Sequence, residues 1–274
     1  MNGRKTERDR GDSRLSRYSK AFRYHLPALI SFAAFFLIWE ALVDLRGIQP
    51  IYLPAPSLIV GTLVSMTLDG TILFHLGFTL LRIFSGFAIA AAIGVGLGIA
   101  MGMSQLCARI LDPWIAALYP LPKISLIPLL IIWLGTGEIY KISIAVFSAF
   151  LPIVITTYAG IRQIEPDLLL TAADLGANKR QTQFKIVVPA AVPSIVAGLQ
   201  LGMGIAIIMV VAAEMIGGSG QTGIGYLLIS AGQVLETEKV FACLIVLAVV
   251  GGAILKGQDY ASRFFAPWAF AQAH

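Results

Sequence analysis

Long apolar segments alternate with short polar ones along most of this chain. The apolar segments hold roughly 16 to 21 residues each, close to the length that an α-helix needs to cross the hydrocarbon core of a membrane. Only helices and closed barrels satisfy every backbone polar group in lipid. The pattern therefore predicts an all-α integral membrane protein with about six transmembrane helices. The expected spans are 26–43, 83–103, 114–134, 142–160, 195–213 and 240–255.

Two of these spans carry features that refine the prediction. Gly94, Gly98 and Gly102 recur every fourth residue in the second span, a spacing that lets two helices approach closely in lipid. The third span is interrupted by Pro120, Pro122 and Pro128, because proline lacks the backbone N–H and breaks a helix. Two shorter apolar segments, 57–68 and 223–234, are expected as short surface or partly inserted helices.

The polar segment 161–189 contains strong helix signals. Pro166 and Asp167 predict a helix start, because proline is tolerated in the first turn and acidic residues suit the positive end of the helix dipole. This helix is expected over 168–175, with apolar residues on one face at spacings of three and four. Gly176 ends it, Asn178 caps a second helix over 179–187, and Pro189 closes the unit. We interpret the segment as two short amphipathic helices at the membrane surface, which is typical of a docking loop.

Composition agrees with a membrane protein. Hydrophobic residues make up 57% of the 274 residues, charged residues only 13%, and the mean hydropathy is +0.82. A soluble domain carries about 25% charged residues. The net charge of +5 lies in residues 1–25, where eight Lys and Arg face three acids. A basic tail beside an apolar span usually sets membrane orientation, so nucleic-acid binding is not expected.

The basic tail also predicts the topology. We expect residues 1–25 to be a disordered cytoplasmic tail. A signal peptide is the rival interpretation, but the apolar segment 26–43 is longer than a usual signal core and lacks a convincing small-residue cleavage site. With the N-terminus inside, fifteen Lys and Arg lie on the cytoplasmic side and four on the outer side. This asymmetry follows the positive-inside rule and places the segment 161–189 in the cytoplasm.

Three sequence blocks resemble the nitrate/sulfonate/taurine subfamily of binding-protein-dependent ABC-importer permeases. Gly176, Ile186 and Pro189 fit the spacing of that family's cytoplasmic glutamate-alanine-alanine loop, with Leu170 standing where the family has Glu. Ala172 matches the last position of the name-giving triplet. The other two blocks are 127–138, IPLLIIWLGTGE, and 212–226, which begins AAEMI and ends GIGY.

The resemblance implies a fold like that of type I ABC-importer permeases and a loop that docks a separate ATPase subunit. It further implies an extracytoplasmic solute-binding protein and a second permease copy as partners. The alternative for the loop is a surface helix that packs only on its own membrane domain. The coupling residues carried over are Asp167, Leu170, Thr171, Ala172, Ala173, Asp174, Gly176, Ala177, Lys179, Ile186 and Pro189.

Three residues are candidates for the translocation pathway or its gate. Lys123 is an ionisable residue inside a predicted span, where charge is costly and often functional; the alternative is that it reaches the interface. Pro128 belongs to the interrupted third span. Glu214 ends the fifth span, where a carboxylate opposes the helix dipole and requires a partner. Glu138 is interpreted as a helix cap and His75 as a solvated or interfacial residue.

The chain contains no G-x-x-x-x-G-K-[ST] motif and hence no phosphate-cradling loop of its own. We expect no cofactor, no metal and no catalytic site, with ATP used by the partner subunit. The expected function is a permease subunit in the bacterial cytoplasmic membrane that imports a small, anionic solute; the alternative is a secondary transporter or channel without an ATPase. The expected divisions are a basic tail (1–25), a first span with its connector (26–52), a permease core (53–263) and a C-terminal tail (264–274).

Overall fold

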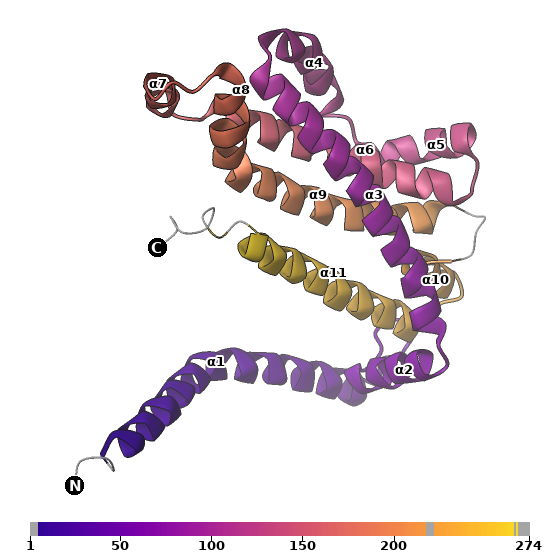
Figure 1. The fold of residues 1–274 in the computed structure, drawn as a ribbon. Coiled ribbons are helices and arrows are strands. Elements are labelled where there is room, and N and C mark those ends of the chain that lie inside the picture. Colours follow the sequence, from indigo (N-terminus) through magenta and orange to yellow (C-terminus); the bar gives the residue numbers. More distant parts are fainter. Residues whose placement is uncertain (1–4, 218–221, 266, 268–274) are drawn as a thin grey trace.

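The computed structural model describes residues 5–217, 222–265 and 267, and the regular structure in these residues is helical throughout (Figure 1). The long apolar helices are α1, α3, α6, α9 and α11. Shorter helices connect them and cover the ends of the bundle. In chain order the elements are α1 (Lys5–Arg46), α2 (Pro56–Leu68), α3 (Thr71–Met103), α4 (Gln105–Leu118), the 3-10 turn η1 (Lys123–Leu126), α5 (Ile127–Leu134), α6 (Glu138–Arg162), α7 (Pro166–Asp174), α8 (Lys179–Thr182), the π turn η2 (Gln183–Val187), α9 (Val188–Ile216), α10 (Ile224–Gln233) and α11 (Thr237–Phe265).

The centre of the bundle is formed by α3, α6 and α9, with α6 packed against both of the others. Small and branched apolar side chains fill this core, among them Ala90, Ala145, Ile153 and Ala206. The α6 helix has the largest buried share of the spanning helices in the described residues. The predicted glycine repeat explains the close approach. A Cβ on Gly98 would lie 2.6 Å from the Cβ of Thr157 in α6, and one on Gly94 would lie 2.8 Å from the Ile153 side chain.

A second apolar cluster joins α2, α3, α10 and α11 at one end of the bundle. By contrast, α1 is peripheral, and most of its side chains from Leu26 onward are exposed. Its contacts gather near its C-terminal end: the Trp39 ring lies 5.7 Å from the Phe241 ring, and the Glu40 carboxylate accepts hydrogen bonds from the Ser57 N–H (3.0 Å) and hydroxyl (2.6 Å). Glu40 thereby caps α2 from another helix, while the remaining apolar surface of α1 suits contact with lipid.

The prediction of about six spans is confirmed for the described residues, with a correction to the third. Five helices are long and apolar enough to cross a membrane, and α4 with η1 and α5 forms a sixth, broken unit bent by 90°. The sequence predicted one interrupted span from residue 114; α4 instead begins at Gln105 and ends at Leu118. The break coincides with Pro120 and Pro122, whose missing N–H groups cannot continue the α-helical hydrogen bonds.

Two other predicted boundaries were wrong. The helix α3 begins at Thr71 rather than near residue 83, so Arg82 lies inside it and is buried against partners described below. The tail expected to be disordered is helical from Lys5, where α1 begins. The tail continues directly into the helix of the first span, so its turns extend a helix that is already nucleated. Residues 1–4 and most of the expected C-terminal tail lie outside the described residues.

Candidate functional site

The predicted docking loop forms two helices joined by a tight turn. The first is α7, with Pro166 in its first turn as expected, although the Glu165 side chain makes no capping hydrogen bond. Gly176 has a positive φ of 80°, a conformation that glycine adopts without strain. The Ala177 N–H donates to the Ala172 carbonyl (3.0 Å) and the Gly176 N–H to the Ala173 carbonyl (2.9 Å). This pair of bonds is a Schellman motif, which satisfies the last carbonyls of α7.

The second helix begins with the expected cap. The Asn178 side chain accepts from the Gln181 N–H, and the Gln181 side chain accepts from the Asn178 N–H, both at 2.9 Å. This reciprocal capping box fixes the entry into α8. Because both turns are closed by backbone and capping hydrogen bonds, the loop has one defined shape.

The prediction that Pro189 closes the loop was wrong. Instead, α8, η2 and α9 form one continuous helical segment of 38 residues, Lys179–Ile216. Pro189 lies in the first turn of α9, directly after the five-residue π turn Gln183–Val187. The widened turn accommodates the proline, which lacks the N–H that an α-helical bond at this position would need. The loop is therefore built into the same rod as the fifth span.

The surface of the loop differs from the predicted single apolar face. Ala172 is buried, whereas Leu170 and Leu175 are 63% and 84% exposed. The base of the loop is fixed by an apolar cluster that includes Ile161 and Val187. Figure 1 shows α7 projecting from the end of the bundle, beside α8. Of the predicted coupling residues, the exposed ones are Asp167, Leu170, Thr171, Ala173, Asp174, Gly176 and Lys179, and the half-buried ones are Ala177, Ile186 and Pro189.

A buried ionic cluster lies at the opposite end of α9. The Arg82 guanidinium is fully buried and donates from Nε and Nη2 to the two carboxylate oxygens of Glu138, both at 2.6 Å. Its Nη1 donates to Glu214 Oε1 at 2.5 Å. The buried Lys141 Nζ lies 3.7 Å from Glu138 Oε1. Two bases and two acids thus share one site, which places balanced charge inside the bundle.

The same cluster holds the start of α10. The N–H of Gly223 donates to His75 Nδ1 (3.1 Å), that of Ile224 to Thr79 Oγ1 (2.9 Å), and that of Gly225 to Glu214 Oε2 (2.9 Å). Side chains of α3 and α9 therefore cap α10 from outside its own sequence. His75, which was expected to be solvated, also stacks on Tyr226 with ring centroids 6.1 Å apart. The sequence indicated that Glu214 needs a partner, and this hydrogen-bond network supplies it.

Glu138 does not cap its own helix as predicted. No side-chain cap is formed at the start of α6, and the carboxylate instead faces Arg82 on α3. The second span was expected to begin at residue 83, which left Arg82 just outside it; the structure instead encloses Arg82 between α3, α6, α9 and the chain before α10. Its Nη1 and Nη2 also reach the Thr222 carbonyl (2.8 Å) and hydroxyl (2.7 Å).

The remaining pathway candidates lie elsewhere. Lys123 begins η1 at the 90° break, is half-buried, and its Nζ lies 3.4 Å from the Tyr119 carbonyl and 5.5 Å from that ring's centroid. Pro128 is exposed in the first turn of α5. Beside this break lies an apolar groove of about 950 Å³ between α3, α5 and α6. The structure joins Glu214 to Arg82 and leaves Lys123 and Pro128 at the broken span.

Comparison with known proteins identifies the family of this chain. Residues 92–260 match the family described as binding-protein-dependent transport system inner membrane component. The chain belongs to this permease family. It is 32% identical over 241 residues to the taurine transport system permease protein TauC of Escherichia coli K12, covering 86% of this chain and 87% of that protein. It is 36% identical over 226 residues to the putative aliphatic sulfonates transport permease protein SsuC of Bacillus subtilis 168, covering 82% and 79%.

The fold also matches solved permeases. An inward-facing structure of the MetNI methionine ABC transporter superposes with a TM-score of 0.59 at 18% identity, covering 68% of this chain and 92% of that chain. The type I importer fold expected from the resemblance is therefore confirmed. The protein is a multi-pass membrane permease component of a binding-protein-dependent importer, with relatives of the taurine and sulfonate type.

The sequence did contain a signal for the ionic cluster of this permease. Arg82, Glu138 and Lys141 each adjoin a predicted span, and Glu214 ends another. Ionisable residues of opposite sign at matching depth in a membrane bundle pair with each other, because unpaired charge there is costly. With antiparallel spans, the starts of the second and fourth spans and the end of the fifth lie at one membrane face. The sequence alone did not show how deeply Arg82 is buried, because its burial depends on where α3 begins.

Proposed function

We propose that this permease imports a small anionic solute of the sulfonate, taurine, nitrate or bicarbonate type across the bacterial cytoplasmic membrane, and that a separate ABC ATPase subunit supplies the energy. The observation that carries the proposal is the shape of the 161–189 loop. It is rigid, projects from the bundle, and exposes Leu170 and Leu175 without a covering element in the described structure. An exposed apolar pair on a fixed helix is the kind of surface that a partner protein covers.

The continuous helix gives a route by which docking could move the spans. A displacement of the loop is a displacement of α8, and α8 is the first part of the 38-residue segment that ends near Glu214. At that far end, Glu214 holds both Arg82 of α3 and the N–H of Gly225. Motion at the loop thus reaches the ionic cluster through one helix. We infer alternating access in which the spans tilt together and Glu214 acts in the outer gate.

The proposed assembly contains two copies of this permease, two ATPase subunits and an extracytoplasmic solute-binding protein. The membrane orientation has the N-terminus and the loop in the cytoplasm, supported by the excess of Lys and Arg on that side. The sulfonate and taurine assignment rests on the relatives named above. Lys123 would attract the anion at the broken span, where irregular backbone lines a path more readily than it faces lipid.

The decisive experiment is co-purification with the ATPase encoded for the same transporter. We expect the tagged permease to retain that ATPase in detergent, and Leu170→Ser combined with Leu175→Ser to reduce retention by about tenfold or more. A matched control is Leu68→Ser with Leu235→Ser, two comparably exposed leucines on other elements. Retention unchanged by the loop pair, or solute uptake by the permease without any ATPase, would overturn the proposal in favour of a secondary transporter or channel.

A further inference from the structure

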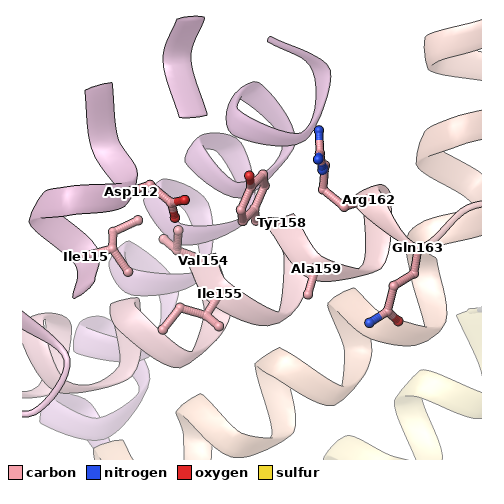
Figure 2. Close-up of a pocket in the computed structure, with 8 residues that line it drawn as sticks. All are labelled: Asp112, Ile115, Val154, Ile155, Tyr158, Ala159, Arg162 and Gln163. Atoms are coloured by element: carbon pink, nitrogen blue, oxygen red, sulfur yellow. The ribbon is translucent and has the colours of Figure 1, made fainter. Parts of the chain in front are cut away.

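A small cavity with a mostly apolar lining and several polar side chains at its rim lies between α4 and the last turns of α6, apart from both sites described above. Its volume is about 380 Å³. Asp112 of α4 lines it from one side, and Tyr158, Arg162 and Gln163 line it from α6 and the residue that follows (Figure 2). In that view the Tyr158 ring stands between the carboxylate of Asp112 and the guanidinium of Arg162. An acid and a base therefore flank the same cavity.

These polar side chains have no partners within the part of the chain that the structure describes. Asp112 and Arg162 form no ion pair with each other or with another residue there, and the side chains of Tyr158 and Gln163 make no hydrogen bond. Asp112, Arg162 and Gln163 are exposed and Tyr158 is half-buried, so each side chain is free to bind a ligand that enters the cavity. Among these side chains, the Asp112 carboxylate is an anionic hydrogen-bond acceptor and the Arg162 guanidinium is a bidentate cationic donor.

The cavity has a firm apolar floor. Ile115 of α4 and Val154 and Ile155 of α6 form its lower wall. Val154 is fully buried and belongs to the cluster that joins α3, α4 and α6. Tyr158 packs on the same cluster, so the wall that carries it is fixed by the core. A ligand would meet a preformed surface rather than organise one, which lowers the entropic cost of binding.

We propose that this cavity binds a zwitterion that carries a primary ammonium and a phosphate or sulfonate. The Asp112 carboxylate accepts hydrogen bonds from the ammonium, and the Arg162 guanidinium donates to the oxyanion in its forked geometry. The apolar floor takes the carbon atoms that join the two groups. This chemistry occurs in the phosphoethanolamine headgroup of a membrane lipid and in a free amino sulfonate. Arg162 ends α6, where a span meets the headgroup region, so both sources reach the cavity.

Occupancy would add a polar link between two elements that already share an apolar cluster. Asp112 lies on α4, while Arg162 is the last residue of α6 and precedes α7 by only a short connection. A bound zwitterion would link α4 to the base of the loop. The inference stands apart from the proposed ATPase coupling, because it concerns a ligand held by this chain alone.

Native mass spectrometry of the purified permease tests the proposal. The probes are phosphatidylethanolamine, phosphatidylcholine and phosphatidylglycerol, added separately to delipidated protein. We expect tighter retention of phosphatidylethanolamine, with Asp112→Asn removing its preference over phosphatidylcholine and Arg162→Gln lowering binding of both by about tenfold. The matched controls are Asp44→Asn and Arg46→Gln in the last turn of α1, exposed residues of the same two types that do not line the cavity. Thermal denaturation of each variant confirms that it is folded.

A second arm separates the lipid from a free ligand. Taurine and phosphoethanolamine are titrated into the permease in phosphatidylglycerol nanodiscs, with heat of binding as the readout. Binding of these free probes that is lost in Asp112→Asn supports a soluble zwitterion as occupant, whereas retention of phosphatidylethanolamine alone supports a lipid. Binding of neither class, or binding that both cavity variants leave unchanged, overturns the proposal. ATPase co-purification with these variants is scored separately, so failure here is distinct from failure of the coupling loop.

Discussion

At the scale of single residues, the ionic cluster shows how charge is kept inside a membrane bundle. Arg82 is fully buried, so its desolvation must be offset by the carboxylates of Glu138 and Glu214 and by Thr222. Removing one partner of a buried pair leaves an uncompensated charge and typically costs about 3–5 kcal/mol. The two acids are unequal, because the Glu214 side chain is buried while that of Glu138 is 44% exposed.

We predict that Glu214→Gln destabilises the permease by about 3 kcal/mol and Glu138→Gln by clearly less. Glu214 also accepts the Gly225 N–H, whereas Glu138 retains water on its exposed side. Thermal denaturation in detergent measures both variants. An equal or larger loss for Glu138→Gln would contradict the described burial of Glu214.

Gly223 provides a second prediction at this scale. Its φ of 111° is unfavourable for any side chain, and a Cβ there would overlap the Glu214 carboxylate. We expect Gly223→Ala to lower the melting temperature and solute uptake together, because the cap of α10 is displaced. Gly61→Ala in α2 is the control, since a Cβ there meets open space. Equal melting temperatures for the two variants would refute this account.

At the scale of elements, the contact between α3 and α6 depends on one glycine-lined stripe. Gly94, Gly98 and Gly102 recur on the face of α3 toward α6, so the two backbones approach without intervening side chains. In a membrane, such close packing replaces the hydrophobic driving force that water gives to a soluble bundle. The stripe is therefore the principal determinant of how these two spans align.

We predict that Gly98→Ala destabilises the bundle by about 1–3 kcal/mol, because its Cβ would lie 2.6 Å from the Cβ of Thr157. Gly96→Ala, two residues earlier on the same helix, faces open space and should be neutral or slightly stabilising. The comparison of their denaturation midpoints is the test. A destabilising Gly96→Ala of the same size would mean that helix flexibility, not packing, governs α3.

The sequence predicted those features that depend on local chemistry. The helix cap at Asn178, the turn at Gly176 and the glycine stripe all follow from the preferences of individual residues, and the structure contains each of them. Features that depend on tertiary partners were missed. Judged from its own residue type, Pro189 was expected to end the helix, but the preceding π turn accommodates it. Arg82 fell just outside the expected second span. Its burial could not be predicted because its carboxylate partners lie 56 and 132 positions away in sequence.

At the scale of the whole molecule, the arrangement places the two candidate sites at opposite ends of one bundle. The loop lies at the N-terminal end of α9 and the ionic cluster at its C-terminal end. In addition, α1 stands at the periphery, with contacts concentrated near α2 and α11. The MetNI structure with a similar fold covers 68% of this chain, so the similar core is shorter than the full chain.

Cysteine labelling of intact cells tests the proposed orientation. In a variant with Cys107→Ser and Cys243→Ala, we expect Asn178→Cys to react only after the membrane is permeabilised. Tyr52→Cys, at a 78% exposed position between α1 and α2, should react from outside without permeabilisation. The reverse pattern would place the 161–189 loop outside the cell and remove the proposed ATPase contact.

The unbroken segment from α8 to the end of α9 has a geometric consequence. At 1.5 Å per residue, its 38 residues extend over roughly 57 Å, well beyond the hydrocarbon layer of about 30 Å. A pivot of about 10° around one end would carry the other through approximately 10 Å. A displacement of that size at the loop end would require no melting of this helix.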